Sequence, residues 1–356
     1  MSDSGSSDSR LSDIGASGTG FRYLRASSTK DAALLGAQPD TAFLAGGTDF
    51  LQLWKAGLQR PRQVVDISRL PLDQISYDDG KLALGAVSRL GAVARHEAVQ
   101  QFHPLIAQAI RASASGQLQN MASMGGNLLQ RTRCLYFRAE GLPCNKRTPG
   151  SGCAALTGEN RQAALFGGSA TCVATHTSDL AVALAALDAE VEVLGQAGTR
   201  RMPLAELYRL PGDDPVRETT LRAGELITEV SVGNAARFAA SSTYLKIRDR
   251  ASFEFAVISV AAALQIEDGL IIDARLAAGG IAPVPWRLSK SEAALLGRKP
   301  DLPTFTNAAD LAIEGARALS QNGFKIELLR SAVIRSLQSS LQRSQQSSQQ
   351  MIGVQP

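Results

Sequence analysis

The sequence has no apolar run long enough to cross a membrane, which takes about 20 residues. Its best candidate, FAVISVAAALQI at 255–266, is typical of a buried core segment. The chain lacks a basic block with interleaved aromatic residues, and its net charge is only +4, so nucleic-acid binding is not indicated. Residues 1–20 lack the basic start and apolar stretch of a secretory signal. We therefore expect a cytoplasmic protein, or a periplasmic one exported together with a signal-bearing partner.

Cysteine is scarce, and the four that occur are Cys134, Cys144, Cys153 and Cys172. No pair has the C-x-x-C spacing of a zinc knuckle, which weakens a structural zinc site. Without a signal peptide, two disulfides are not expected unless the chain is co-exported. Four thiolates are, however, the number that a [4Fe–4S] cluster needs. The spacing alone leaves open a metal or cluster site and thiols that bind no metal.

The segment around the cysteines is rich in Pro, Gly and cationic residues, where a hydrophobic core would not form. Such cations would lower the pKa of nearby thiols and offset the charge of a cluster, unless they simply face solvent. The cations are Arg131, Arg133, Arg138, Lys146 and Arg147.

The length of 356 residues predicts two or three domains. Residues 1–19 are rich in Ser, Gly and Asp, and residues 342–356 in Gln and Ser, so both ends are predicted to be disordered tails. Residues 20–236 mix helix and strand patterns, whereas 237–341 read as a strand meander followed by helices. In the first part, strands are expected at 41–45, 62–67, 81–86 and 189–195, and helices at 49–57, 89–100 and 178–189.

Two Gly-Gly pairs punctuate the first part of the chain. AGGTDF at 45–50 lies between an expected strand and an expected helix, and Thr48 is a candidate helix cap. The second pair, in SMGGN at 123–127, is followed by Asn127, which tolerates unusual turn conformations. AGGTDF matches neither the Rossmann fingerprint nor a Walker loop. Both pairs are compatible with plain turns, or with one extended phosphate-bearing ligand held between them.

A third motif, TSDL at 177–180, opens an expected helix, where Ser178 or Asp179 would be a good N-cap. Alternatively, the Asp179 carboxylate binds a ribose hydroxyl or another polar group of the same ligand. Cys134 lies seven residues after Asn127, and Cys172 lies seven residues before Asp179. Seven residues reach at most roughly 25 Å, so whatever the cysteines hold is tethered to the proposed ligand site. A redox cluster beside a redox cofactor explains this arrangement better than a structural zinc clip.

Together, AGGTDF, SMGGN, TSDL and YLKIRDRASF resemble the FAD-binding subunit of the xanthine dehydrogenase and carbon monoxide dehydrogenase family of molybdenum hydroxylases. The resemblance covers roughly residues 20–335. GGNLLQRTRC, PCNKRTPGSGC and KIRDRAS are similar to one subgroup, the flavoprotein subunits of bacterial periplasmic aldehyde oxidoreductases, which carry FAD and a [4Fe–4S] cluster. The implied fold is α+β: a two-lobed α/β FAD-binding domain (20–236) followed by a smaller C-terminal domain (237–341) of antiparallel sheet and helices.

The resemblance implies that the first Gly-Gly loop cradles the FAD pyrophosphate through backbone N–H groups, and that the second flanks the flavin and its phosphates. It places Asp179 against ribityl or adenosine hydroxyls, Ile227 against the cofactor and Lys246 near the isoalloxazine. It also makes Cys134, Cys144, Cys153 and Cys172 the ligands of the cluster, within a loop at 131–172. The implied FAD-binding residues are Ala42, Phe43, Leu44, Ala45, Gly46, Gly47, Thr48, Asp49, Phe50, Ser123, Gly126, Asn127, Asp179, Ile227 and Lys246.

The three histidines are not predicted to act in catalysis. His176, where shorter family members often have proline, is expected to be a loop residue, and His96 and His103 are expected to be structural residues within helical segments. The sequence shows no catalytic triad and no carboxylate pair, so no catalytic residue is assigned.

The implied function is that of an electron-transfer flavoprotein subunit. A molybdenum-cofactor large subunit would oxidise an aldehyde, a [2Fe–2S] small subunit would pass the electrons on, and FAD in this chain would deliver them to an external acceptor. The expected assembly is a heterotrimer without a membrane span. Two other functions stay open: a self-sufficient FAD-dependent oxidase, and a non-enzymatic scaffold with a structural zinc site.

Overall fold

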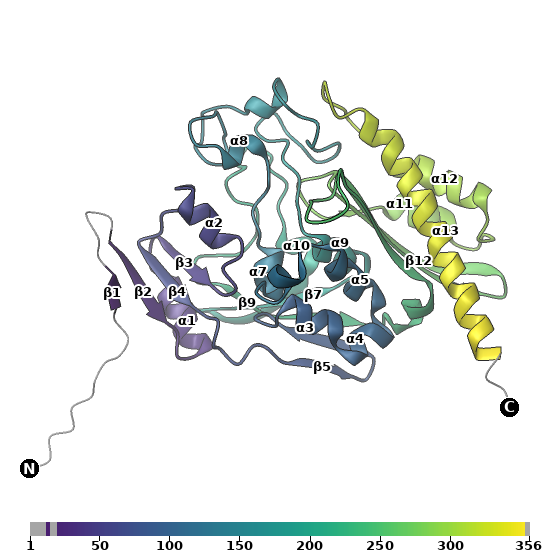
Figure 1. Cartoon of the computed structure of the whole chain (residues 1–356), viewed down its shortest axis with the longest axis horizontal. Coiled ribbons are helices and arrows are strands. Elements are labelled where there is room, and N and C mark those ends of the chain that lie inside the picture. Colours follow the sequence, from purple (N-terminus) through teal and green to yellow (C-terminus); the bar gives the residue numbers. More distant parts are fainter. Residues whose placement is uncertain (1–11, 15–19, 353–356) are drawn as a thin grey trace, which may run out of the picture.

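The computed structural model describes residues 12–14 and 20–352, which form three sheets with helices between and around them (Figure 1). The first sheet has the order β1-β2-β4-β3, with β2, β4 and β3 parallel and β1 antiparallel to β2. Its strands are β1 (Ser12–Ile14), β2 (Phe21–Arg25), β3 (Thr41–Leu44) and β4 (Gln63–Asp66), and its helices are α1 (Thr29–Gly36) and α2 (Phe50–Lys55). Parallel strands need crossover connections, and α1 and α2 provide them.

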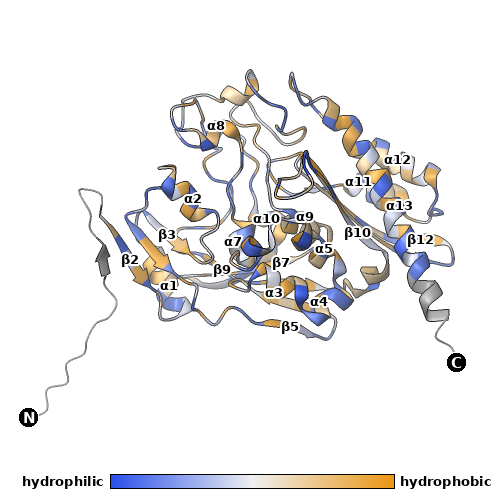
Figure 2. Ribbon diagram, viewed as in Figure 1, coloured by the Kyte–Doolittle hydropathy of each residue, from blue (hydrophilic) through white to orange (hydrophobic). Residues whose placement is uncertain are grey.

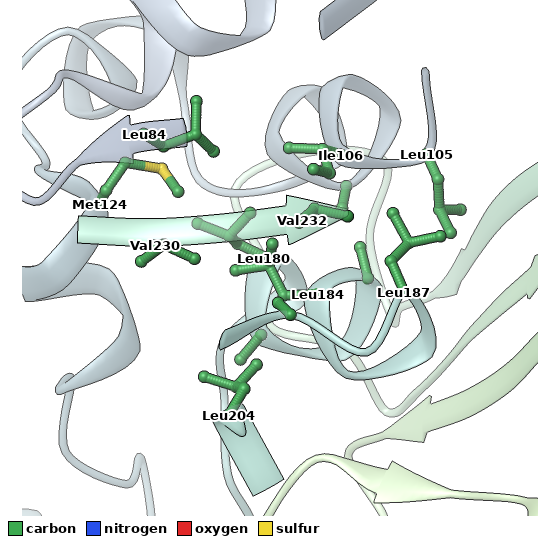
Figure 3. Close-up of a cluster of buried hydrophobic side chains, with 14 of the residues drawn as sticks. Leu84, Leu105, Ile106, Met124, Leu180, Leu184, Leu187, Leu204, Val230 and Val232 are labelled. Atoms are coloured by element: carbon green, nitrogen blue, oxygen red, sulfur yellow. The ribbon is translucent and has the colours of Figure 1, made fainter. Parts of the chain in front are cut away.

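The second sheet is antiparallel throughout, with the order β5-β6-β9-β7-β8. Its strands are β5 (Ile75–Asp78), β6 (Lys81–Gly85), β7 (Glu190–Gly195), β8 (Gly198–Pro203) and β9 (Leu226–Gly233). Along β6, alternate residues are buried, as expected where one face of a strand packs on a core. Figure 3 shows Leu180, Val230 and Val232 gathered between this sheet and the helices.

The helices that complete this lobe are mostly short. They are α3 (Leu90–Arg95), α4 (Glu97–Phe102), α5 (Pro104–Ala112), α6 (Gly116–Gln119), α7 (Met124–Leu128), α8 (Leu135–Arg138), α9 (Asp179–Ala186) and α10 (Leu204–Leu207), with 3-10 turns η1 (Ala154–Leu156) and η2 (Ala236–Ser241). Helix α9 is buried along almost its whole length. Because it is apolar all round, it lies at the centre of the molecule and not on its surface.

The third sheet is antiparallel with the order β10-β11-β12-β13 and belongs to the C-terminal part. Its strands are β10 (Ser242–Ile247), β11 (Ile258–Glu267), β12 (Leu270–Gly279) and β13 (Trp286–Arg287), and its helices are α11 (Ser289–Leu295), α12 (Leu302–Ala312) and α13 (Phe324–Ile352). Strand β11 is buried on both faces: Ala261 and Ala263 join the core around α9, while Val260 and Leu264 join the core under the C-terminal helices. This explains why residues 255–266 are almost all apolar.

The α+β fold class is confirmed, and so are most of the expected strands and helices. The single helix expected at 89–100 is divided into two helices, α3 and α4. His96 lies between them with an extended backbone (φ −64°, ψ 130°). His96 and His103 therefore lie at helix ends and not within helices.

The predicted disorder of both tails needs correction where the structure describes them. At the N-terminus, Ser12–Ile14 pairs with β2, and the rest of 1–19 lies outside the described residues. At the C-terminus, α13 runs on to Ile352, so 342–352 is helical. A Gln/Ser-rich sequence lacks an apolar face, but it contains no helix breaker, so a helix already started on the core can continue through it.

No helix in the described part of the chain is both long and apolar enough to span a bilayer.

Candidate functional site

A cavity of about 820 Å³ opens between two lobes, the first sheet with its helices and the second sheet with its helices. Its volume is within the size range of ligand and cofactor sites. The loop after β3, the start of α7, the segment before α9 and the segment leading into β9 form its walls. Pro283 from the C-terminal part closes one side. Of the predicted FAD-binding residues, those that line the cavity are Ala42, Phe43, Ala45, Gly46, Gly47, Thr48, Asp49, Phe50, Ser123, Gly126 and Ile227.

The first Gly-Gly pair lies in residues 45–50, which we call the ligand loop. Gly47 has φ +70°, a left-handed conformation that favours glycine. A Cβ on Gly46 would collide with the backbone carbonyl of Met121, so this glycine lets the ligand loop approach the second Gly-Gly motif closely. Thr48 does not cap the following helix, because helix α2 begins at Phe50 and its N-cap residue is Asp49. No side chain makes a capping hydrogen bond at this helix start.

The second Gly-Gly pair does not form a turn, because Gly125, Gly126 and Asn127 lie within helix α7. A Cβ on Gly125 would lie 3.2 Å from the Ala86 side chain, so the glycine allows α7 to pack closely on the chain after β6. The Ser123 hydroxyl precedes the helix, lines the cavity and is buried without a hydrogen-bond partner. A buried polar group of this kind is satisfied when a ligand supplies the partner.

Four predicted binding residues do not line the cavity: Leu44, Asn127, Asp179 and Lys246. Asn127 accepts a hydrogen bond from Ser178 (2.6 Å), whose hydroxyl also caps helix α9 by accepting from the Ala181 backbone N–H. The capping role considered for Ser178 is therefore confirmed.

Asp179 and Lys246 form a buried ion pair with each other, with 2.7 Å between Oδ2 and Nζ. The second Asp179 oxygen accepts a hydrogen bond from the Tyr244 hydroxyl at 2.7 Å. Burial and then the Asp179 charge raise the pKa of Tyr244 well above its ordinary value, which keeps it a donor. Lys246 also donates to the Ala112 carbonyl at 3.1 Å. In this structure the pair joins α9 to β10, and neither side chain offers a free polar group to the cavity.

His176 lines the cavity, which its sequence position in a loop did not reveal. Its ring packs edge-on against Tyr208, with 4.8 Å between ring centroids. Its Nδ1 accepts a weak bond from the Ser178 backbone N–H at 3.3 Å, whereas Nε2 is buried and unpartnered. Burial lowers the pKa of His176 to about 4, so the imidazole is neutral near pH 7.

Two further wall segments, 36–41 and 216–226, escaped sequence analysis because they carry no recognisable motif. The second contains Glu218, which pairs with Arg131 and, at 3.0 Å, with Lys146. Lys146 is buried and also donates to the Pro215 carbonyl at 2.8 Å. These contacts fasten the 216–226 segment to the cysteine-bearing segment.

The cysteine-bearing segment, residues 131–172, forms a long loop that carries short helix α8 (Figure 1) and mixes polar and apolar residues (Figure 2). We call it the thiol loop. Cys144 and Cys153 face each other across an isolated antiparallel bridge. Cys134 packs in one apolar cluster with Cys144 and in another with Cys153. All four cysteines are free thiols.

The prediction that cationic neighbours lower the thiol pKa values is wrong for Cys134 and Cys172. Burial raises the pKa of the Cys134 thiol, and it raises the pKa of Cys172 to about 11 although Lys146 opposes the shift. The neighbouring thiols add to both shifts, Cys153 among them in each case. The charges are engaged elsewhere, because Arg133 and Arg138 pair with Asp49, and Arg147 donates to backbone carbonyls of the loop.

Within the part of the chain that the structure describes, no group of three or more His, Cys, Asp or Glu side chains is placed to hold a metal ion. The four thiols of the described chain thus do not form the compact shell of a single tetrahedral zinc.

Comparisons with known proteins agree on one family. Residues 19–234 match the FAD binding domain in molybdopterin dehydrogenase, and residues 243–341 match the CO dehydrogenase flavoprotein C-terminal domain. The chain is 46% identical over 278 residues to the aldehyde oxidoreductase FAD-binding subunit PaoB of Escherichia coli (strain K12), covering 77% of this chain and 86% of that protein. It is 25% identical to the glyceraldehyde dehydrogenase medium chain of Sulfolobus acidocaldarius, covering 78% and 82%.

Solved structures share the fold. The reconstituted CO dehydrogenase from Oligotropha carboxidovorans contains a chain that matches with a TM-score of 0.71 and 19% identity, covering 91% of this chain and 98% of that one. Carbon monoxide dehydrogenase from Hydrogenophaga pseudoflava matches with a TM-score of 0.69 and 24% identity over the same shares. On the family matches and the 46% identical relative, this chain belongs to the FAD-binding medium-subunit family of the molybdopterin dehydrogenases.

Proposed function

We propose that this chain is the electron-transfer flavoprotein subunit of a molybdenum-dependent aldehyde oxidoreductase. The observation that carries the proposal is the 820 Å³ cavity between two Gly-Gly motifs, in a chain 46% identical to the FAD-binding subunit of an aldehyde oxidoreductase. Residues 20–236 would form its FAD-binding domain and 237–341 its C-terminal domain.

The cavity residues fit FAD. Gly46 and Gly47 line the cavity, where backbone N–H groups of the ligand loop would bind a pyrophosphate. Ser123 and His176 each present a buried, unpartnered polar atom among the lining residues, ready to be satisfied by polar groups of a ligand. Ile227 adds an apolar wall. Bound FAD would supply the electron-transfer chemistry, and the chain would bind it, orient it and exclude water.

The thiol loop fits an iron–sulfur cluster by its donor set. All four cysteines of the thiol loop are free thiols, Cys134 packs near both Cys144 and Cys153, and a [4Fe–4S] cluster takes four cysteine thiolates, each on a different iron. No cysteine pair has the C-x-x-C spacing of a zinc knuckle, which favours a cluster over a structural zinc. Cys134, Cys144, Cys153 and Cys172 would be the ligands.

The remaining partners follow from this role. The chain would receive electrons from a [2Fe–2S] subunit, which receives them from a molybdenum-cofactor subunit, and would pass them to an external acceptor. We propose one copy of each subunit, located in the periplasm after co-export or in the cytoplasm.

The test is cofactor analysis of anaerobically purified protein. We expect yellow-brown protein with about one FAD and four irons per chain, and loss of the iron in Cys144→Ser with FAD retained. FAD without iron would leave the flavoprotein role and remove the cluster. Stoichiometric zinc without flavin would support the scaffold function instead, and aldehyde oxidation by the molybdenum-free chain would support the self-sufficient oxidase.

A further inference from the structure

Asp49 occupies an unusual position between the ligand loop and the thiol loop. It is the last polar residue of the ligand loop and lines the cavity. Its carboxylate is only 14% exposed and accepts its hydrogen bonds from the thiol loop. Oδ2 accepts from the Arg131 backbone N–H at 2.8 Å, and Oδ1 accepts from the Arg138 guanidinium at 2.9 Å. Oδ1 also forms an ion pair with the Arg133 guanidinium, with 2.9 Å between the N and O atoms.

These three partners surround the first cysteine of the thiol loop. Arg138 also donates to the Thr132 carbonyl at 2.9 Å and to the Arg131 carbonyl at 3.1 Å, so it closes the chain around Cys134. The Cys134 backbone N–H in turn donates to the Thr132 hydroxyl at 3.2 Å. The conformation of the chain at Cys134 is therefore built on one carboxylate that belongs to a different lobe.

The same carboxylate is rigidly connected to the glycines. The Asp49 carbonyl accepts from the Gln52 and Leu53 backbone N–H groups, and the Gly47 carbonyl accepts from Leu51. A change in the backbone at Gly47 therefore moves the base of helix α2 and the Asp49 side chain with it. Because Arg133 and Arg138 are also mostly buried, losing Asp49 as a partner leaves buried charge uncompensated.

We propose that Asp49 couples the two sites: a dinucleotide in the cavity fixes the ligand loop, and Asp49 transmits this order to the thiol loop around Cys134. Asp49 is then a positioning residue for the thiols. The inference rests on the proposed function, since it takes FAD as the occupant of the cavity. Coupling of this kind is reciprocal, so an ordered thiol loop also raises the affinity for FAD.

The experiment measures thiol protection and needs neither the cluster nor catalysis. The full chain is freed of iron and flavin, and the alkylation rate of Cys134 by iodoacetamide is followed by mass spectrometry with and without saturating FAD. FAD binding is measured separately by fluorescence. We expect FAD to slow alkylation of Cys134 about fivefold or more in the wild type, in the range of typical coupling between sites.

Two variants and one control localise the effect. Asp49→Ala removes the carboxylate and is expected to abolish the protection. Arg138 does not line the cavity, so the Arg138→Gln variant should still bind FAD. Its protection of Cys134 by FAD should fall. Arg147→Ala is the control, because among the described residues Arg147 donates only to carbonyls inside the thiol loop, at Tyr136, Phe137 and Leu142. It should speed alkylation with and without FAD and leave the ratio between the two rates unchanged.

The possible failures are distinct. If the wild type binds FAD but Cys134 is alkylated equally fast in both states, or if Arg138→Gln retains full protection, the coupling is refuted and the flavoprotein role stands. If the wild type binds no FAD, the proposed function falls and the coupling falls with it.

Discussion

Gly46 and Gly47 are glycine for different physical reasons. Gly47 needs a left-handed backbone, whereas Gly46 needs room beside the Met121 carbonyl. The first requirement shapes the ligand loop itself, and the second lets it meet the segment that precedes the other Gly-Gly motif. The sequence shows two adjacent glycines, but only the structure separates backbone conformation from close approach.

The first prediction at this scale concerns Gly47→Val. A β-branched side chain at φ +70° is strongly disfavoured, and its Cβ would also lie only 3.0 Å from the Leu51 side chain. We expect Gly47→Val to lose FAD binding. Asp179→Ala should bind FAD more tightly than Gly47→Val, because the Asp179 side chain does not line the cavity. Flavin content after desalting measures both. Normal flavin content in Gly47→Val would refute the role of the ligand loop.

The second prediction concerns His103, which is 1% exposed and has no hydrogen-bond partner on either ring nitrogen. Burial lowers its pKa from 6.5 to about 4, so the unfolded chain binds a proton between these values that the folded chain does not. The free energy of unfolding should therefore fall as pH drops from about 6.5 to 4. In His103→Leu this loss should be smaller, by up to roughly 3 kcal/mol. Urea titrations at several pH values measure it, and equal losses in both proteins would contradict the prediction.

Sequence patterns located two walls of the cavity but not the partners of the charged residues that were predicted to line it. Gly46, Gly47 and Gly126 line the cavity, and such glycines leave a local signature in the sequence, whereas Ile227 was predicted from the family resemblance alone. Asp179 and Lys246 bond to each other across 67 positions, and no local pattern encodes such a pair. His176 was missed as a lining residue for the same reason, since its burial depends on Tyr208 and on the distant segment before β9.

At the scale of elements, β11 and α9 show why the chain folds as one unit. Ala261 and Ala263 on one face of β11 are small, which lets buried helix α9 pack closely against the C-terminal sheet. The opposite face presents Val260 and Leu264 to the C-terminal helices. A run of apolar residues predicted a core segment correctly, but the division of that run between two cores depends on which helices cover each face.

Lys325 supports the third prediction, on helix α13. Its side chain is fully buried, and its ammonium donates to the carbonyls of Ala163 (2.9 Å) and Gly280 (2.5 Å). It thus joins α13 to the end of the thiol loop and to the chain after β12. Lys325→Ala leaves these carbonyls unpaired and creates a cavity, so we expect a loss of about 2 to 4 kcal/mol in the free energy of unfolding.

Urea denaturation checks this value against Lys290→Ala, whose side chain is exposed and pairs with Glu314 at the surface. That control should lose less than about 1 kcal/mol. If the two variants were equally stable, the carbonyl contacts of Lys325 would not anchor α13.

Local propensity predicted the elements well and their ends poorly. The single helix expected at 89–100 is interrupted at His96, and the C-terminal helix continues through a Gln/Ser-rich stretch that composition alone suggested to be disordered. Both differences concern where a helix stops, which depends on neighbouring elements more than on the residues themselves.

At the scale of the whole molecule, the thiol loop contacts both the first lobe and the C-terminal part. Arg133 reaches Asp49 in the first lobe and stacks over Phe255 of the C-terminal part, with 4.8 Å from its guanidinium carbon to the ring centroid. Arg161 of the thiol loop forms a bidentate ion pair with Asp249 of the C-terminal part. Its two terminal guanidinium nitrogens donate to the two carboxylate oxygens at 2.9 and 3.0 Å. A cluster in this loop would therefore be fixed relative to both the flavin cavity and the C-terminal sheet.

The last prediction is that the chain transfers electrons only within a hetero-oligomer. Large apolar side chains stay exposed on the thiol loop and near it, including Leu135 at 58%, Leu142 at 38% and Phe253 at 54%. A stable partner interface buries on the order of 1,000 Å² or more, and exposed apolar side chains of this size suit its core. Co-expression with molybdenum-cofactor and [2Fe–2S] subunits should therefore yield a complex of three chains that reduces a dye with aromatic aldehydes, and this chain alone should be inactive.

Leu135→Glu, on the exposed side of α8, should weaken assembly at unchanged FAD content, whereas Leu296→Glu, exposed in the C-terminal part, should not. Assembly unaffected by Leu135→Glu would place the interface elsewhere, and aldehyde oxidation by the isolated chain at a comparable rate would refute the subunit role.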